Sequence, residues 1–432
     1  MDLILGTSKR DITPDRPVPL AGFSSRQGFY EGVSRPLHVR IWFFRQTDRD
    51  GRERQALLAQ ADLIWWGTDL AARVRRRLAE RFGLPEEAII LHASHTHGGP
   101  QTSGMFPRGL GEADERYVAA LAEKLEQAAE EACMAGEPVR VERGHGLCRI
   151  GINRRKRSGA GIEWAPNPDG PVDPEVTVIR FATKSGGTKG VWFHYTCHPT
   201  TTGDNQVTSE FPGVAMEAVE EALGGGSIAS FLQGCCGDIR PNIVDGGEFR
   251  AGSDDDVVRL GCALRDEVLR VLASPLEPIS LCELRGERHV VPLYFERMPD
   301  ISELKERQED AGVMGEWSRY LLAAPERRKA AAPLDMTALH IAAGLTLAAM
   351  SGEIVVAYGT YIKKRYGGNV LPLAYSNGMV GYVPTTEQLA EGGYESVESA
   401  YHFGLPSPFR PSVESDMITG LHKLLDETGK PC

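Results

Sequence analysis

Two histidines separated by one residue are the strongest chemical signal in the chain. His95 and His97 follow a short apolar run, Ala88 to Leu91, and precede Gly98-Gly99-Pro100. In an extended chain, residues i and i+2 project to the same side, about 6–7 Å apart along the backbone, so both imidazoles can reach one site. Neutral imidazole is a frequent zinc ligand. The same spacing also occurs in core or loop histidines that hold no metal, so the pair alone leaves both interpretations open.

Further candidate ligands follow other apolar runs. His194 and His198 flank the end of the run Val191 to Phe193, and Glu353 follows the run Leu339 to Met350. Two or three histidines with one carboxylate form the ligand set of a catalytic zinc that keeps an open position. The chain has no H-E-x-x-H motif, which argues against a common metalloprotease. The sequence therefore predicts a zinc site assembled from separate segments.

The elements that must position these residues alternate between strands and helices. Apolar, β-branched runs that end in polar turns are expected at residues 88–91, 191–193, 228–232, 339–350 and 370–375. Caps and a period of 3.6 residues predict helices at 68–83 with Thr68 as N-cap, 113–135, 253–272, the charged stretch 301–331, and 413–426. This alternation predicts an α/β fold, with a mixed β-sheet core flanked by helices. In open α/β sheets, sites lie beyond the carboxyl ends of strands, where the unusual residues occur here.

Composition excludes several other classes of protein. The chain has 432 residues, of which 41% are hydrophobic, so disorder is not the general state. Its formal net charge of −11 argues against nucleic acid as the main partner. No apolar run approaches about 18 residues and no secretory leader is visible, which predicts no transmembrane helix and a cytoplasmic location. Nucleotide-binding glycine motifs, a G-x-S-x-G elbow and C-x-x-C pairs are all missing from the sequence.

Several segments together resemble the catalytic domain of the neutral/alkaline non-lysosomal ceramidases, and their order is kept along roughly residues 1–400. Residues 94–100 are similar to the family's T-H-T-H-S-G-P motif, and residues 381–387 continuing to Tyr394 resemble its G-Y-V-T-T-R-E-x-Y segment. The other matching segments are Gly6 to Pro14, Gly151 to Arg154, His198 to Thr200, and Gly237 to Asn242.

The resemblance implies a role for each matching residue. A zinc ion would be held by His95, His198, Glu353 and Tyr382. Glu353 would also act as general base, and His97 and Tyr394 would donate hydrogen bonds to the developing oxyanion. Arg154 would help to hold the substrate.

The sequence also departs from the family pattern. Arg240 replaces the serine of the family's G-D-V-S-P-N motif, and Ser34 replaces a histidine of an early segment. Arg240 brings a permanent charge toward the expected pocket, which suits a carboxylate, phosphate or polyol-bearing substrate. The family's C-terminal immunoglobulin-like domain and its secretion signal are not expected in this chain.

We therefore expect residues 1–432 to form a single ceramidase-like catalytic domain, with a charged helical segment inserted at about 301–331. The expected activity is zinc-dependent hydrolysis of a linear, ceramide-like N-acyl amide by a metal-activated water, with Arg154 and Arg240 contacting the substrate. Two alternatives stay open. One is a hydrolase of a small polar amide, ester or sugar-derived metabolite on the same zinc site, and the other is a non-catalytic binding homologue. The sequence does not set the oligomeric state.

Overall fold

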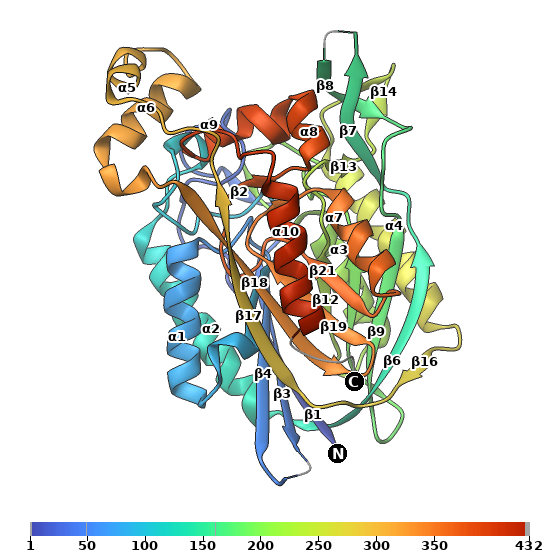
Figure 1. The fold of residues 1–432 in the computed structure, drawn as a ribbon. Coiled ribbons are helices and arrows are strands. Elements are labelled where there is room, and N and C mark those ends of the chain that lie inside the picture. The colour runs from blue at the N-terminus through green and yellow to red at the C-terminus, as the bar shows by residue number, and fades with distance from the viewer. Residues whose placement is uncertain (1, 49, 160, 428–432) are drawn as a thin grey trace.

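Two β-sheets packed face to face form the centre of the computed structural model, which describes residues 2–48, 50–159 and 161–427 (Figure 1). Helices cover the outer face of each sheet. The mixed sheets flanked by helices confirm the predicted fold class, with two sheets in the core.

The larger sheet has nine strands within the described residues, in the order β12-β10-β9-β6-β1-β3-β4-β5, with β16 paired to β6. The strands are β1 (Leu3–Asp11), β3 (His38–Thr47), β4 (Glu53–Ala61), β5 (Ile89–Ala93), β6 (Glu137–Leu147), β9 (Glu175–Thr183), β10 (Thr188–Tyr195), β12 (Ile228–Gln233) and β16 (Glu277–Ile279). The pairs β4–β5 and β10–β12 are parallel, and the other pairs are antiparallel.

The smaller sheet has the order β17-β18-β19-β21. Its strands are β17 (Arg285–Tyr294), β18 (Ala331–Ala342), β19 (Leu345–Met350) and β21 (Val370–Leu373). The run Leu339 to Met350, expected as one strand, is instead a hairpin that turns at Ala343-Gly344. Gly344 has φ +77°, which glycine adopts without a steric cost. Periodicity could not show this turn, because both strands are buried and both therefore read as apolar.

Aromatic side chains fill the space between the two sheets. Trp42 of β3 packs edge-on against Trp192 of β10, with ring centroids 5.3 Å apart. Leu339 and Leu347 of the smaller sheet belong to the same buried cluster. Each such aromatic pair contributes about 0.5–1.5 kcal/mol beyond the burial of its area. This core fixes the two sheets against each other and thus fixes the loops at their ends.

The helices predicted at 68–83, 113–135, 253–272 and 413–426 lie close to observed helices, whereas four further helices of the described residues, between residues 210 and 402, were not predicted. The observed helices are α1 (Thr68–Phe82), α2 (Glu115–Met134), α3 (Glu210–Leu223), α4 (Asp254–Leu272), α5 (Ile301–Arg307), α6 (Val313–Ala323), α7 (Val356–Arg365), α8 (Thr386–Glu391), α9 (Ser399–His402) and α10 (Val413–His422). α1 to α4 cover the larger sheet, and α10 packs on the smaller one (Figure 1). None of the helices in the described part of the chain is long and apolar enough to cross a membrane.

Two helix predictions need correction. Gly67, and not Thr68, is the N-cap of α1, because the Thr68 hydroxyl accepts a hydrogen bond from the Met379 amide at 3.1 Å instead of capping the helix. The charged stretch 301–331 is not one helix. It forms α5, α6 and a short 3-10 turn at Pro325–Arg327, and β18 already begins at Ala331. α5 and α6 project from the body of the molecule in Figure 1.

Short strands at the ends of the sheets carry most of the remaining candidate residues. They are β2 (Gly32–Val33), β7 (Gly151–Ser158), β8 (Gly161–Asn167), β11 (Gln206–Val207), β13 (Ile239–Pro241), β14 (Val244–Asp245), β15 (Glu248–Phe249), β20 (Glu353–Ile354) and β22 (Tyr382–Val383). β20 pairs with β22 in parallel and sets Glu353 directly opposite Tyr382.

Candidate metal and catalytic site

The site lies where the two outermost strands on the path of the larger sheet approach each other. β5 and β12 stand at opposite ends of the strand order, yet the buried Gln233 at the end of β12 joins them. Its amide Nε2 donates hydrogen bonds to the Ser94 carbonyl at 3.1 Å and to the Cys197 carbonyl at 2.8 Å. These carbonyls immediately precede His95 and His198. One side chain therefore holds together the two loops that carry the candidate ligands.

His95 is fixed from two sides just beyond the end of β5. Its Nδ1 donates to the Ile64 carbonyl at 2.7 Å, and its ring stacks on Tyr375 with centroids 3.8 Å apart. Its φ of +66° is left-handed, a conformation that costs of order 1–3 kcal/mol in a residue other than glycine. His95 and His97 therefore do not form the extended pair that their spacing suggested. Their imidazoles still meet, with ring centroids 4.8 Å apart.

His198 is oriented by main-chain carbonyls. Its Nδ1 lies 2.6 Å from the Cys236 carbonyl and 2.8 Å from the Ile239 carbonyl. A carbonyl only accepts hydrogen bonds, so Nδ1 carries the proton and the Nε2 lone pair is free in the neutral ring. Burial, aided by the charge of Arg154, lowers the pKa of His198 to about 4, so the ring is neutral near pH 7. This partner pattern is typical of metal-binding histidines.

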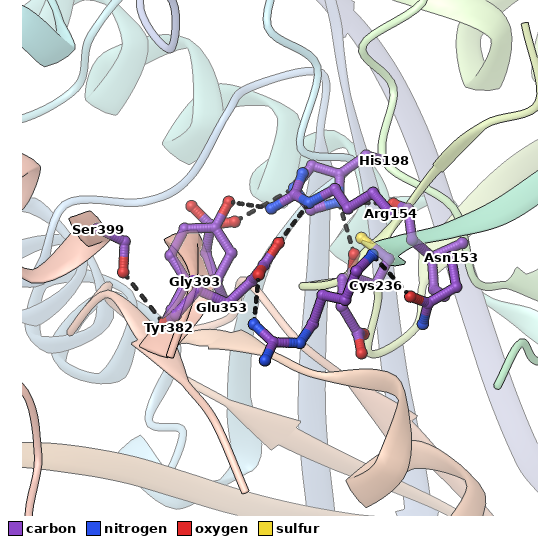
Figure 2. A network of polar contacts seen from close by, with 12 residues as sticks. Asn153, Arg154, His198, Cys236, Glu353, Tyr382, Gly393 and Ser399 are labelled. Atoms are coloured by element: carbon purple, nitrogen blue, oxygen red, sulfur yellow. Dashed lines mark hydrogen bonds and ion pairs between the residues drawn. The ribbon is translucent and has the colours of Figure 1, made fainter. Parts of the chain in front are cut away.

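The free nitrogens converge on one carboxylate oxygen. Glu353 Oε2 lies 3.2 Å from His198 Nε2 (Figure 2). It lies 3.4 Å from His95 Nε2, and His97 Nε2 lies 3.3 Å from His95 Nε2. Four ligands at 2.0–2.1 Å around a tetrahedral cation are separated from one another by about 3.3 Å. Acceptor atoms at this spacing repel one another unless a cation or protons lie between them. The buried histidine group could therefore bind a metal ion, and the donor spacing fits an ion with zinc's ligand distances.

Glu353 is held as a carboxylate. Burial raises its pKa, but the neighbouring His95 and His198 outweigh burial and leave the pKa well below its ordinary value. All of its hydrogen bonds and ion pairs with described residues use Oε2, so Oε1 is left without a protein partner in this part of the chain.

Tyr382 faces the same centre and is tied to Arg154. Arg154 Nη2 donates to the Tyr382 hydroxyl at 3.0 Å (Figure 2), and Arg154 Nε donates to Glu395 at 2.7 Å. Burial raises the pKa of the Tyr382 phenol well above 10, while the charge of Arg154 opposes that shift. Tyr394 begins a π-helical turn, Tyr394–Glu398, and its ring centroid lies 5.6 Å from that of Tyr382. The Arg154 guanidinium lies within 6 Å of both ring centroids.

His97 differs from the other two histidines in its partners. Its Nδ1 is buried and has no hydrogen-bond partner among the described residues. Its ring packs against Phe23 with centroids 4.9 Å apart, and a Cβ added to Gly22 would lie 2.3 Å from Nδ1. Burial lowers the pKa of His97 well below its ordinary value, and His95 and His198 act in the same direction. His97 is thus a neutral ring with one nitrogen unused by the protein.

The structure brings together the seven residues His95, His97, Arg154, His198, Glu353, Tyr382 and Tyr394. His194 lies elsewhere, because its Nε2 donates to the carbonyl of Pro372, on β21 of the smaller sheet, at 2.9 Å. Among the described residues, Ser34 forms hydrogen bonds only to Val207, at the β2–β11 pair. The guanidinium of Arg240 packs over the rings of Trp164 and Phe249.

Sequence reasoning missed the supports of the site: Gly22, Gln233, Tyr375 and Glu395. Two of them had a usable signal, since Gln233 and Tyr375 lie at the ends of predicted apolar runs, where site residues were expected. Glu395 directly follows Tyr394 but gave no separate indication of its pairing with Arg154. Gly22 lies in a loop whose approach to His97 depends on tertiary structure alone.

Comparison with known proteins gives the family. The family model described as neutral/alkaline non-lysosomal ceramidase, N-terminal, matches residues 3–269. The chain belongs to this family, as the resemblance of its motifs predicted. The neutral ceramidase of Mycobacterium tuberculosis is 28% identical over 271 residues, which is 56% of this chain and 40% of that protein. The match therefore spans about two fifths of the length of this curated relative.

Solved structures show the same fold. The crystal structure of neutral ceramidase from Pseudomonas aeruginosa matches with a TM-score of 0.77 and 18% identity, over all of this chain and 75% of that one. A structure titled ceramidase complexed with C2 matches with a TM-score of 0.77 and 19% identity, over all of this chain and 76% of that one. At such low identity, these matches establish the fold and do not transfer an activity.

Proposed function

We propose that this protein is a zinc-dependent hydrolase of a linear N-acyl amide. The observation that carries the proposal is the convergence of His95, His198 and Glu353, whose acceptor atoms lie 3.2–3.4 Å apart with both histidine Nδ1 atoms held by carbonyls. Membership in the neutral ceramidase family supports the amide as the bond that is cleaved.

We assign the zinc ligands to His95, His198, Glu353 and Tyr382. A zinc ion bound there would supply a water of lowered pKa and polarise the substrate carbonyl. Arg154 supports this ligand set, because its hydrogen bond to the Tyr382 hydroxyl favours the phenolate, which a cation would favour further.

The remaining residues handle protons and charge. Glu353 Oε1 contacts no polar atom of the described residues. We propose that this oxygen accepts the proton of the attacking water. His97 and Tyr394 are assigned as donors to the oxygen on which negative charge develops, and a donor of this kind contributes about 3–4 kcal/mol to the transition state. Arg154, fixed by Glu395, is assigned to substrate binding.

The family suggests a ceramide-like N-acyl amide as substrate. A second candidate, a small polar amide or ester, is favoured by Arg240, whose charge has no counterpart in the family motif. The two candidates share the zinc site and differ only in the group recognised beside it.

Metal content and turnover test the proposal together. Purified protein should hold about one zinc per chain by mass spectrometry. His198→Ala should lose the zinc, whereas His340→Ala should keep it, because His340 is a buried histidine of β18 that is hydrogen-bonded to Thr346 of β19, away from the site. Glu353→Gln should reduce hydrolysis of a short fluorescent ceramide or of polar N-acyl amides at least 100-fold. A wild-type rate in Glu353→Gln contradicts the mechanism. Bound zinc without hydrolysis of either substrate class would indicate a binding homologue.

A further inference from the structure

Arg240 is a buried guanidinium that lies over two aromatic rings. Its Cζ atom is 4.6 Å from the centroid of Trp164 and 4.3 Å from that of Phe249. Trp164 belongs to β8 and Phe249 to β15, and their own centroids are 5.1 Å apart. Two separate hairpins thus present aromatic faces to one charged group. Trp164 is half exposed, so this pair of rings borders solvent.

Within the described residues, the guanidinium of Arg240 forms no ion pair, although the charge of Glu210 acts on it from a distance. The residue is only 8% exposed, yet its side chain makes no hydrogen bond or ion pair with any described residue, and its Nε is shielded from solvent without a partner. Its neighbours on β7 are different, since Arg154 and Arg155 share the carboxylate of Glu395. Burial and the charge of Arg154 lower the pKa of Arg240 to about 10, which still leaves it positive at neutral pH. A buried cation without a partner is expected to bind an anion.

Arg240 also lies next to the candidate metal site. It directly follows Ile239, whose carbonyl is 2.8 Å from His198 Nδ1. Across the β13–β7 pair it opposes Ile152, two residues before Arg154. Arg154 and Arg240 are close enough to affect each other electrostatically. Of these two guanidinium groups near the site, Arg154 forms an ion pair with Glu395, whereas Arg240 forms none with the residues that the structure describes.

We propose that Arg240 binds an anionic group of the substrate, a carboxylate, sulfonate or phosphate, and thereby selects anionic N-acyl amides over neutral ones. This inference rests on the proposed function for the identity of the amide. The guanidinium offers several N–H donors in a plane, which matches such anions, and the faces of Trp164 and Phe249 keep that plane in place. A purely structural role, in which Arg240 only joins the two hairpins, would not distinguish charged from neutral ligands.

The first experiment measures binding with matched probes. Calorimetry compares N-hexanoyl-ethanolamine with its O-phosphate, and adds N-hexanoyl-glycine and N-hexanoyl-taurine, on wild-type protein with zinc supplied. We expect at least one anionic amide to bind about 10–100-fold more tightly than the neutral amide, the range expected for a hydrogen bond between charged groups. Equal or weaker binding of all three anionic probes would overturn the proposal.

The second experiment uses variants with the same probes. Arg240→Gln should abolish the preference for the anionic probe, and Arg240→Lys should retain part of it, because the charge stays while the planar donor set is lost. Trp164→Ala tests the aromatic support without touching the charge and should weaken the preference. The control is Arg157→Gln on the same hairpin, since Arg157 is exposed and pairs with Glu387 and Glu391. Retention of the full preference in Arg240→Gln would contradict the proposal.

Hydrolysis, measured separately, distinguishes the two proposals. Anionic probes that bind through Arg240 but are not hydrolysed would contradict the amidase function and support the anion site. Hydrolysis of neutral and anionic amides at equal kcat/KM would support the amidase and overturn the role of Arg240.

Discussion

The orientation of each candidate ligand is decided by atoms that a sequence motif does not include. His95 and His198 present Nε2 to the centre because main-chain carbonyls of Ile64, Cys236 and Ile239 accept hydrogen bonds from Nδ1. An arrangement of carbonyl acceptors of this kind depends on the path of the chain and not on residue type. The histidines could be predicted from their spacing and from the family motif. Their tautomer, with the proton on Nδ1 and Nε2 available to bind a metal, could be inferred only from the fold.

Gly22 illustrates a residue that supports the site through its missing side chain. It has φ +96°, and a Cβ there would lie 2.3 Å from His97 Nδ1 and 2.7 Å from Ile64. Gly22→Ala should therefore displace His97, and a misplacement of about 1 Å can reduce turnover roughly 100-fold. Zinc content should stay near one per chain, because His97 is not among the assigned ligands. Turnover and metal analysis on the same preparation check both points.

Gly28→Ala is the control for this substitution. Gly28 has φ +73° but nothing within 4 Å of an added Cβ, so it carries the cost of a left-handed alanine, about 1–2 kcal/mol, without the collision. Equal turnover in the two variants would contradict the collision argument. Loss of zinc in Gly22→Ala would instead make His97 a ligand, in keeping with its Nε2 lying 3.3 Å from that of His95.

At the scale of elements, Gln233 connects the loop that follows β5 with the loop that follows β10, although these strands are far apart in the order of the larger sheet. Gln233→Met keeps the volume but removes both donors, and each buried carbonyl left without a partner costs about 1–3 kcal/mol. We expect lower stability together with weaker zinc binding and turnover, because Ser94 and Cys197 precede the two histidine ligands. Urea unfolding, metal titration and activity measure the three effects.

Gln46→Met provides the matched control. Gln46 is also a buried glutamine, and its Nε2 donates to the Cys282 carbonyl at 2.8 Å, at the far end of β3. This variant should lose stability to a similar extent and keep its zinc affinity. If both variants lose zinc equally, the effect is general destabilisation and the positioning role of Gln233 is wrong.

The start of α4 gives a pH dependence that is independent of the site. Ser253 and Asp256 form a capping box, and Arg250 and Arg259 bind the same Asp256 carboxylate. Hydrogen bonds from these arginines hold the pKa of Asp256 below its ordinary value. A carboxyl whose pKa is lower when folded stabilises the protein above its unfolded pKa, about 3.9, and this stabilisation is lost as the pH falls toward the folded pKa.

Asp256→Asn should therefore be less stable than wild type at pH 7, and the difference should shrink below about pH 4. Urea midpoints measured from pH 7 to pH 3 follow this difference. The neighbouring Asp255 is exposed and makes a suitable comparison, so Asp255→Asn should show a smaller difference at pH 7. A difference for Asp256→Asn that stays constant down to pH 3 would exclude the ionised carboxylate as its source.

Sequence patterning predicted elements better than their connections. α4 begins at its predicted capping residue, because a cap is a local feature. The hairpin within 339–350 was missed, because two buried strands and their turn form one apolar run. The contact between β5 and β12 could not be predicted for a different reason, since it depends on the curvature of the whole sheet and on the buried Gln233.

At the scale of the whole molecule, the candidate ligands come from four segments between residues 95 and 382. His95 and His198 extend from the larger sheet, while Glu353 and Tyr382 lie on the β20–β22 pair beyond the smaller one. A bound ion would therefore link the ends of two sheets that are already fixed by their shared core of Trp42, Trp192 and Leu347. Because this core does not involve the ligands, the fold should persist without metal.

Chelation tests this separation of fold and site. An ion that binds only the folded chain stabilises it by RT ln(1 + [L]/Kd), about 4.1 kcal/mol at a thousandfold excess over Kd. Removal of zinc should therefore lower Tm by several degrees, leave the circular dichroism spectrum at 25 °C unchanged and abolish hydrolysis, and added zinc should restore both Tm and activity. His198→Ala should show a Tm that does not respond to chelator. Unfolding of the wild type on chelation at 25 °C would instead make the ion a structural one, as in small zinc domains whose folding requires metal, and would contradict an open catalytic site.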